Sequence, residues 1–349
     1  MNLPTRHPLS LERFDYDLPP DLIAQTPVEP RDASRLLLVD RARAALEDRH
    51  FSDLPDLLNP GDTLVLNDTR VLPARLRGMR SSGGAVELLL LHPNGPEWIA
   101  MARPARRLRD GERIGLFDRN GQLHAHAVEV IGRVAEGFRV RLAPHVDINA
   151  FGEVPLPPYI HESIPDPERY QTVYASIPGS AAAPTAGLHF TQNLLQRCHD
   201  RGIDIAYVTL HVGLDTFAPI RSDDARAHVM HSEAFQVSAA TLGALHRTRS
   251  RGGRIVAVGT TAVRTLESLE NLCFPMEESS LHGTTDLYIT PGHPFKHVDA
   301  LITNFHLPRT TLLILVSAFA GEELTRRAYA HAIARRYRFY SFGDAMLIV

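Results

Sequence analysis

Two different hydrophobic patterns divide this 349-residue chain, and their order limits the folds that it can adopt. Between about residues 72 and 155, short apolar stretches alternate with turn residues, including the Asn-Gly pairs at 94–95 and 120–121. Short strands with such turns are typical of a small antiparallel barrel or sandwich. We therefore expect strands at 84–92, 97–104, 111–117, 123–130 and 138–143.

After about residue 185 the pattern changes to an alternation of helix and strand. We expect helices at 191–201, 238–251 and 260–272, strands at 203–213, 254–259, 285–289 and 299–307, and then two further helices. Such alternation favours a largely parallel sheet with helices on both faces. Because 35–40 and 62–68 resemble the later strands, the sequence predicts an α/β fold. Its expected form is a discontinuous three-layer α/β domain, residues 1–71 and 156–349, with an inserted small antiparallel β-barrel domain, residues 72–155.

Composition is that of a globular protein, with 44% hydrophobic and 22% charged residues. The apolar run at 311–320 is too short to span a bilayer and predicts a buried helix. The first ten residues hold no apolar signal core, so we expect a cytoplasmic protein without a membrane partner. Cys198 and Cys273 are too few for a disulfide framework. The net charge of −3 argues against a histone-like binder but permits a local RNA-binding patch.

The stretch "SAAAPTAGLHFT", residues 180–191, combines small residues, a glycine and a histidine just before an expected helix. In open α/β sheets, ligands bind at the carboxyl ends of strands, near helix N-termini. Gly187 would let a ligand approach the backbone, while Thr185 and His189 would supply a hydroxyl and an imidazole. A tight loop with packed alanines and a backbone-bonded histidine explains the same residues without a ligand.

Further polar residues follow expected strands. His211 and Asp215 come directly after the strand at 203–213, and His228, His231 and Glu233 lie shortly beyond. The His228–His231 spacing could bind a metal on a helix, but no third ligand accompanies it, so we expect no metal. A carboxylate beside a histidine favours proton transfer or ligand orientation instead.

Three more stretches have the same strand-then-polar order. A glycine and threonines before a helix suit a phosphate or carboxylate, although the dinucleotide and P-loop motifs are absent. A polar tetrad lies at the expected domain boundary, where a simple turn would also explain it. The first stretch contains Gly259, Thr260 and Arg264, and the polar tetrad is Asn67, Asp68, Thr69 and Arg70. In the third stretch, Asn304 and His306 lie at the end of the expected strand 299–307.

Arginines gather in two places, "ARPARRLRDGER" and "RRAYAHAIARRYRFY". Arginine pairs with phosphate, and the tyrosines of the second stretch could stack on bases, so both suit RNA. Solvated surface explains either cluster equally well. The candidate tRNA contacts are Arg106, Arg107, Arg335 and Arg336.

Taken together and in order, these stretches resemble the S-adenosylmethionine:tRNA ribosyltransferase-isomerase family. The similar blocks run from about residue 13 to the end: "FDYDLPPDLIAQTP", "DASRLLLVDR", "LVLNDTRVLPARL", "YQTVYA", "APTAGLHFT", "HVGLDTFAPI", "HSEAF", "VAVGTTAVRTLES", "TDLYITPGHPFKHVDALITNFHLP", "TLLILVSAFAG" and "RFYSFGDAMLIV". The resemblance implies transfer of the ribosyl part of S-adenosylmethionine, a co-substrate, to 7-aminomethyl-7-deazaguanine at the tRNA wobble position. Adenine and methionine leave, the ribose is isomerised, and no metal is required.

That chemistry suggests roles for the candidate residues. A base must remove a C5′ proton, and the candidates are His211, Asp215, His231 and Glu233. An acid must protonate the departing adenine, for which we consider His189 and His306. The co-substrate would contact Asn67, Asp68, Arg70, Thr185, Gly187, Gly259, Thr260, Arg264 and Asn304. We expect these segments to converge on one hollow between the two modules, in a monomer.

Two other interpretations remain open at this point. The "VAVGTT" loop at 256–261 also suits an S-adenosylmethionine methyltransferase. An RNA-binding protein without catalytic activity is the other alternative, although it leaves the histidines and carboxylates at strand ends unexplained.

Overall fold

The computed structural model of the chain describes residues 8–162, 164–213, 220, 222–269 and 280–349. They pack into two compact units, each with its own core. The α/β unit comprises the residues up to Asp68, Pro158–Ser176 and Pro184–Val349; the barrel unit comprises Thr69–Pro157 and Ile177–Ala183. The chain was expected to change domain after residues 71 and 155, and the short return to the barrel unit at 177–183 was not expected.

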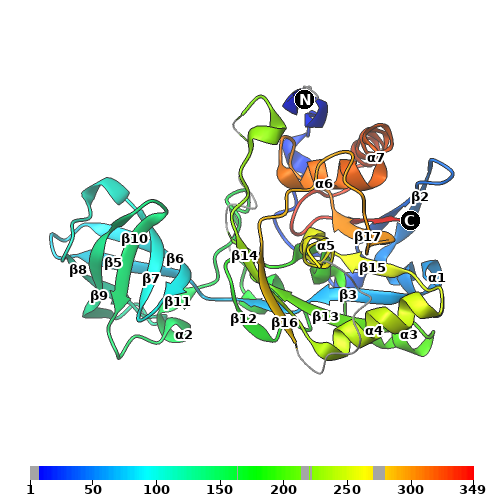
Figure 1. Ribbon diagram of the computed structural model, residues 1–349. Helices are drawn as coiled ribbons and strands as arrows, with labels where there is room; N and C mark the ends of the chain where they lie inside the picture. The colour runs from blue at the N-terminus through cyan, green and yellow to red at the C-terminus, as the bar shows by residue number, and fades with distance from the viewer. Residues whose placement is uncertain (1–7, 163, 214–219, 221, 270–279) are drawn as a thin grey trace, which may run out of the picture. The chain divides into compact units, whose positions relative to one another are not determined.

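The described part of the α/β unit contains a mixed nine-stranded sheet (Figure 1). Its order is β16 (Leu281–Thr285), β14 (Glu233–Val237), β13 (Asp204–Leu210), β3 (Thr63–Asn67), β15 (Ile255–Val258), β17 (Ala300–Asn304), β18 (Ala345–Ile348), β1 (Arg35–Asp40) and β2 (Ala45–His50). The central strands β13, β3, β15 and β17 are parallel, and β1 is parallel to β18. The remaining pairs are antiparallel, so the expectation of a largely parallel sheet holds only for the centre.

Helices cover both faces of this sheet and give the three layers that the sequence predicted. One face packs on α4 (Ala239–Ser250), α5 (Thr260–Glu267), α6 (Thr311–Ala320) and α7 (Glu322–Ala334). The other packs on α1 (Leu54–Leu57) and α3 (Gln192–Asp200). In Figure 1, α6 and α7, in orange and red, lie against each other, and α6 is the buried helix predicted from the apolar run at 311–320. No described helix is long and apolar enough to cross a membrane.

Side-chain caps fix where the helices begin. The Thr191 hydroxyl accepts the backbone N–H of Leu194 at the start of α3, and the Ser238 hydroxyl accepts that of Thr241 at the start of α4. Such caps satisfy N–H groups that have no partner within the helix. The strand expected at 285–289 is wrong, because β16 ends at Thr285.

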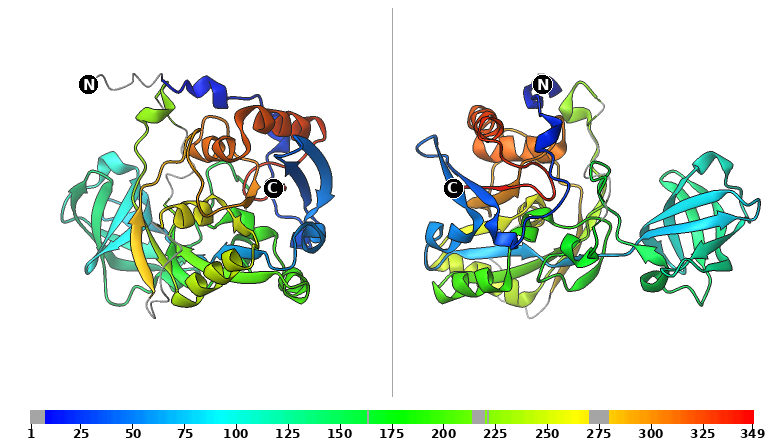
Figure 2. Two further views of the ribbon diagram at one scale, coloured as in Figure 1. Left: turned by 45° about the vertical axis from the view of Figure 1, so that its right-hand side comes forward. Right: turned by 180° about the vertical axis from the view of Figure 1, so that it is seen from behind.

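The barrel unit is a closed antiparallel barrel, seen from further sides in Figure 2. Within the described residues its strands follow the order β5 (Arg75–Arg80), β6 (Ala85–Asn94), β7 (Glu97–Arg103), β10 (Gly137–Leu142), β9 (Leu123–Val134) and β8 (Arg113–Phe117). Pairing of β5 with β8 closes the ring and leaves no free edges. The unit also contains β11 (Gly152–Glu153), α2 (Ile148–Phe151) and the short parallel pair β4 (Thr69–Val71) and β12 (Ile177–Ser180).

Candidate active site

Four parallel strands of the α/β unit end at the same edge of the sheet, and each is followed by a candidate residue. β3 ends at Asn67, β13 is followed by His211, β15 by Gly259, and β17 ends at Asn304. Because neighbouring parallel strands run in the same direction, their carboxyl ends lie side by side. The fold therefore brings together residues that are far apart in the sequence.

Asn67 and Asp68 tie the end of β3 to that of β13. The fully buried Asn67 amide donates to the carbonyl of Leu210 and accepts its N–H, both at 3.0 Å, and so continues the ladder between the strands. The Asp68 carboxylate accepts the hydroxyls of Thr209 at 2.7 Å and Ser176 at 3.1 Å. These contacts hold the Asp68 carboxylate in place at the strand end.

His211 is an imidazole held without charge at the end of β13. Its backbone N–H donates to the carbonyl of Ala234 at 3.1 Å, which fixes its position beside β14. Burial lowers the pKa of His211, while the negative charge of Asp68 acts in the opposite direction. The ring is therefore neutral at neutral pH and is able to accept a proton. Asp215 lies outside the described residues.

Glu233 and Arg264 form a buried ion pair, with only 8% and 6% of their side chains exposed. Arg264 also donates from Nε to the carbonyl of Leu287 at 3.0 Å and from Nη2 to that of Thr285 at 3.3 Å. Glu233 accepts the backbone N–H of Gly213 at 3.0 Å through its other oxygen. Pairing and these hydrogen bonds offset the large cost of burying two charges.

Two hollows of the described α/β unit lie near these strand ends, and a further one lies beside His189 and is lined in part by Arg31 and Arg169. The first, which we call the His306 hollow, lies at the end of β17 and is lined by Tyr159, Thr185, Asn304, Phe305, His306, Leu307, Thr310, Leu312, Tyr340 and Ser341. At its wall, the Thr185 hydroxyl donates to Asn304 Oδ1 at 2.9 Å, and Asn304 Nδ2 donates to the carbonyl of Tyr340 at 3.1 Å. The hydrogen bonds thus fix the orientation of the Asn304 amide.

His306 is the titratable group of this hollow. Its Nε2 lies 2.7 Å from the Thr303 hydroxyl, and its backbone N–H donates to the Tyr329 hydroxyl at 2.9 Å. Burial lowers the pKa of His306 to about 3. The imidazole is consequently neutral at physiological pH, and so low a pKa makes it a weak base.

The second hollow, the Arg264 hollow, lies at the start of α5, directly after β15. Its lining comprises Met230, Thr260, Thr261, Arg264, Leu287, Tyr288, Ile289, Thr311, Leu312 and Leu315. Leu312 of α6 lines both hollows, so they adjoin each other. Gly259 has φ of +85°, a conformation that favours glycine, and leads directly into the helix.

His189 makes its contacts with the protein itself. Its ring nitrogens lie 3.1 Å from the carbonyl oxygen of Ala186 and 2.9 Å from that of Gly343, and the ring stacks on Phe51 at 4.9 Å. Burial lowers the pKa of His189, whereas the two carbonyl contacts raise it. His189 thus has the backbone contacts that the sequence left open as one alternative, and its ring also lines the further hollow beside Arg31 and Arg169.

Gly187 leaves room for a tyrosine. A Cβ at this position would lie 2.0 Å from the Tyr174 hydroxyl and 2.9 Å from Cγ2 of Thr172. The neighbour whose closeness requires glycine at position 187 is thus Tyr174, which belongs to the same unit.

Other candidates do not line the two hollows, although the His228 ring packs edge-on against Tyr288, with ring centres 5.7 Å apart. His231 is exposed in the segment before β14 and His228 follows a short 3-10 turn, so the helical His228–His231 pair considered for metal does not form. Arg70 lies on β4 and belongs to the barrel unit, whereas Asn67 and Asp68 belong to the α/β unit.

The four candidate tRNA contacts are exposed, but they differ in their neighbours. Within the described residues, Arg106 and Arg107 of the barrel unit make no ion pair. Arg336 pairs with Asp21 at 2.6 Å, and Arg335 lies 3.9 Å from Asp48.

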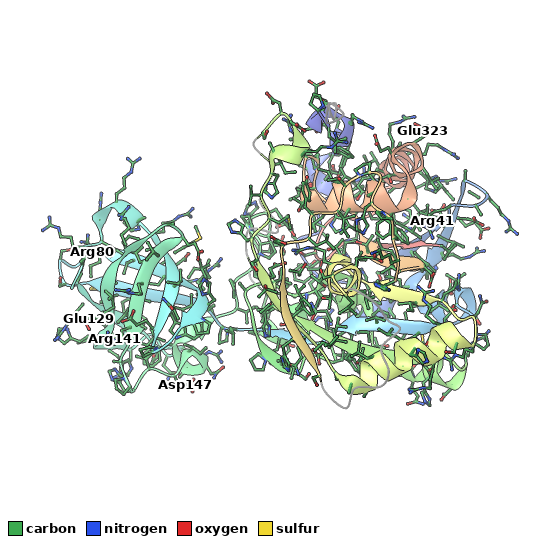
Figure 3. The ribbon with its side chains drawn as sticks, viewed as in Figure 1. Arg41, Arg80, Glu129, Arg141, Asp147 and Glu323 are labelled. Atoms are coloured by element: carbon green, nitrogen blue, oxygen red, sulfur yellow. The ribbon has the colours of Figure 1, made fainter. Side chains whose placement is uncertain are left out.

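Elsewhere on the barrel unit, arginines are neutralised by nearby carboxylates. Figure 3 labels Arg141 and Glu129 on neighbouring strands, with an N–O separation of 3.5 Å. Glu97 pairs with Arg139 at 2.8 Å and with Arg141 at 2.7 Å.

Comparison with known proteins decides the family. The model of a family described as queuosine biosynthesis protein matches residues 11–348. The chain belongs to this family. The match includes the described strand ends, both hollows and the barrel.

Individual relatives of the queuosine biosynthesis family agree over their full length. An S-adenosylmethionine:tRNA ribosyltransferase-isomerase from Symbiobacterium thermophilum is 53% identical over 352 residues, which cover 98% of this chain and 100% of that protein. One of the same name from Moorella thermoacetica is 52% identical, with the same coverage. The crystal structure of an S-adenosylmethionine tRNA ribosyltransferase from Thermotoga maritima is 39% identical and covers 97% of this chain and 100% of that one, with a TM-score of 0.56.

Sequence reasoning missed several residues that line the hollows of this family member. Tyr159 and Tyr340, whose ring centres are 4.9 Å apart, both line the His306 hollow, and Tyr288 lines the Arg264 hollow. Tyr288 and Tyr340 lie in blocks that carried the resemblance, "TDLYITPGHPFK" and "RFYSFGDAMLIV". Their position in these blocks could have marked both tyrosines as candidate site residues. Tyr288 was instead assigned to the interior of the strand expected at 285–289.

Proposed function

We propose that this member of the queuosine biosynthesis family is an S-adenosylmethionine:tRNA ribosyltransferase-isomerase. It transfers and isomerises the ribosyl moiety of S-adenosylmethionine onto the aminomethyl group of 7-aminomethyl-7-deazaguanine at the tRNA wobble position. The products are epoxyqueuosine-tRNA, adenine and methionine. The observation that carries the proposal is the cluster of buried polar side chains beside two hollows, in a chain that relatives of this name match from end to end.

The first chemical requirement is a base for a C5′ proton next to the sulfonium. A neutral imidazole meets it, and burial keeps both His306 and His211 neutral. We assign the proton to His211, because the nearby Asp68 carboxylate stabilises the imidazolium formed. His306 borders a hollow and is the second candidate, since its pKa of about 3 makes it a weak base.

The second requirement is an acid for the departing adenine. An imidazolium in a buried place gives up its proton readily, because burial disfavours its charge. In the proposed sequence His211 takes the C5′ proton and then delivers it to adenine, so one residue serves as base and then as acid. Glu233, His189, Asp215 and His231 stay as secondary candidates for proton transfer.

The co-substrate contacts follow from the strand ends. Thr185, Asn304, Thr260 and Arg264 line the hollows, and the N–H groups that follow Gly259 begin α5. A helix start favours a negatively charged group such as the methionine carboxylate. We propose that Asn67 and Asp68 position this edge, and keep Gly187 and Arg70 as candidates with less support.

The tRNA substrate must present its wobble base outside the anticodon stack for reaction in a buried site. We propose that Arg106, Arg107, Arg335 and Arg336 contact tRNA phosphates. Their exposure supports this role, and the absence of an ion pair within the described residues makes Arg106 and Arg107 the stronger pair.

An assay of released products tests the function. The purified chain is incubated with S-adenosylmethionine and tRNA that carries either 7-aminomethyl-7-deazaguanine or guanine at the wobble position. We expect equal amounts of adenine and methionine with the first tRNA and neither with the second. Formation of S-adenosylhomocysteine would point instead to a methyltransferase, and tRNA binding without any product would point to an inactive RNA-binding protein.

A further inference from the structure

Two buried hydroxyls in the Arg264 hollow have no partner in the protein. Neither Thr261 Oγ1 nor the Tyr288 hydroxyl makes a hydrogen bond within the described part of the chain, and both atoms are shielded from solvent. Both residues line the same hollow. Because buried polar groups in folded proteins are nearly always hydrogen-bonded, this pair indicates that a bound molecule supplies the partners.

The charged wall of the hollow favours a carboxylate as the ligand group. The Arg264 guanidinium has five N–H donors. Three described acceptors engage it, namely Glu233 and the carbonyl oxygens of Leu287 and Thr285. The remaining donors and the two free hydroxyls can bind a carboxylate together, and the start of α5 adds a favourable dipole.

The rest of the lining is apolar. Met230, Leu287, Ile289, Leu312 and Leu315 surround the polar group. Such a surface suits the methylene groups of a bound molecule and the neutral thioether of the methionine product, whose burial is favourable. A carboxylate attached to a short apolar chain with sulfur is the methionyl part of S-adenosylmethionine.

The adjoining His306 hollow suits a flat ring instead. Tyr159 and Tyr340 place aromatic surface there, and Asn304 offers an oriented amide. Aromatic side chains stack on purines, and amides read their edges by hydrogen bonds.

Resting on the proposed function, we propose that the two hollows divide S-adenosylmethionine between them. The Arg264 hollow binds the methionyl group through Thr261 and Tyr288, and the His306 hollow binds the adenine. Leu312 then lies beside the sulfonium and the ribose, where the reaction occurs.

Product inhibition distinguishes the two hollows, because methionine and adenine are separate products. We expect Thr261→Val and Tyr288→Phe each to weaken inhibition by methionine about tenfold, the cost of removing one hydrogen bond to a charged group. Inhibition by adenine should stay unchanged in both variants. Tyr159→Leu should have the reverse effect, weakening inhibition by adenine only.

The matched control is Thr325→Val, the same substitution at a buried threonine of α7 whose hydroxyl donates to the Gly321 carbonyl. It should alter neither inhibition constant. Calorimetric titration of each unreacted protein with methionine alone gives a readout that needs no turnover, and circular dichroism verifies folding. Unchanged methionine affinity in folded Thr261→Val and Tyr288→Phe would overturn the division of the ligand. If the methionine affinity is unchanged in the variants but the wild type releases adenine, only the division of the ligand is wrong and the proposed function stands. If the wild type releases no adenine, the proposed function is wrong.

Discussion

Burial at the strand ends makes His306 a source of pH-dependent stability. Its pKa is about 3 in the folded chain, against about 6.5 for a free histidine. Between these values the unfolded chain binds a proton that the native chain does not, so stability is present above about pH 6.5 and is lost as the pH falls toward 3. Two further histidines, the buried His189 and the half-buried His211, have lowered pKa values and contribute in the same direction.

We therefore expect His306→Gln to flatten the acid side of the stability profile. The free energy of unfolding should depend on pH less steeply than in the wild type, by up to about 1.4 kcal/mol per pH unit, the value for one proton. Urea unfolding at several values between about pH 4 and 7 measures this. His199→Gln, on an exposed histidine with 69% of its side chain accessible, is the control. A slope that His306→Gln leaves unchanged would mean that His306 is not the titrating group.

Gly187 offers a second test at the scale of single residues. Gly187→Ala should destabilise the chain by about 1–3 kcal/mol, as overpacking does, because the new Cβ would lie 2.0 Å from the Tyr174 hydroxyl. Tyr174→Phe alone should cost little, since that hydroxyl has no described hydrogen-bond partner. Combining the two should recover part of the stability in urea unfolding. Simple additivity of the two effects would show that the tyrosine hydroxyl is not the obstacle.

The same residues show what could be predicted one position at a time. The sequence suggested that Gly187 lets a ligand approach the backbone, yet it offered no means of knowing that Tyr174, thirteen positions earlier, lies close to it. Likewise, position after a strand selected His306 and Asn304, but the burial that keeps His306 neutral depends on Tyr329 and Thr303 packing around it. Residue type was visible in the sequence, whereas the surroundings were not.

At the scale of elements, the Ser238 hydroxyl caps the start of α4. Ser238→Ala should lower the free energy of unfolding by about 1 kcal/mol, because the Thr241 N–H loses its acceptor. Ser238→Asp should retain most of the stability, since aspartate caps equally well. Ser250→Ala, at the other end of the helix, removes a hydroxyl that donates to the His246 carbonyl and is the matched control. Equal destabilisation by Ala at both positions would contradict a specific capping role.

Strand direction was less accessible than strand position. The segments of β1, β3, β13, β15 and β17 were found because apolar runs bounded by helices are distinctive. β14 and β16 were not, since the first has only partly apolar residues and the second, "LHGTT", has little hydrophobic character. These two strands supply one antiparallel edge of the sheet, and β14 places Glu233 beside β13. The mixed sheet therefore could not be derived from hydrophobic pattern alone.

At the scale of the whole molecule, the separate cores of the two units explain why the chain can interrupt one unit with another. Leu76, Leu88 and Val130 belong to the core of the barrel unit, while Val65 and Ile302 belong to the two cores on either face of the sheet. Each unit buries its own apolar surface, which is the requirement for a domain. The sequence revealed the insertion because the hydrophobic pattern changes there from alternating helices and strands to strands alone.

Arg106 and Arg107 of the barrel unit make no ion pair within the described residues, and this leads to a prediction about tRNA binding. Arg106→Ala with Arg107→Ala should weaken tRNA binding and reduce the slope of log affinity against log salt by about 0.7–0.9 for each phosphate that the variant no longer neutralises. Arg139→Ala with Arg141→Ala removes the same charge from the same unit, but these arginines already pair with Glu97. Their removal should change the slope less, because their charge is already compensated. Binding titrations at several salt concentrations compare the two double variants. Equal slopes would indicate that the number of arginines on the barrel, and not their position, determines the effect on binding. The barrel would then act only through its overall electrostatic potential.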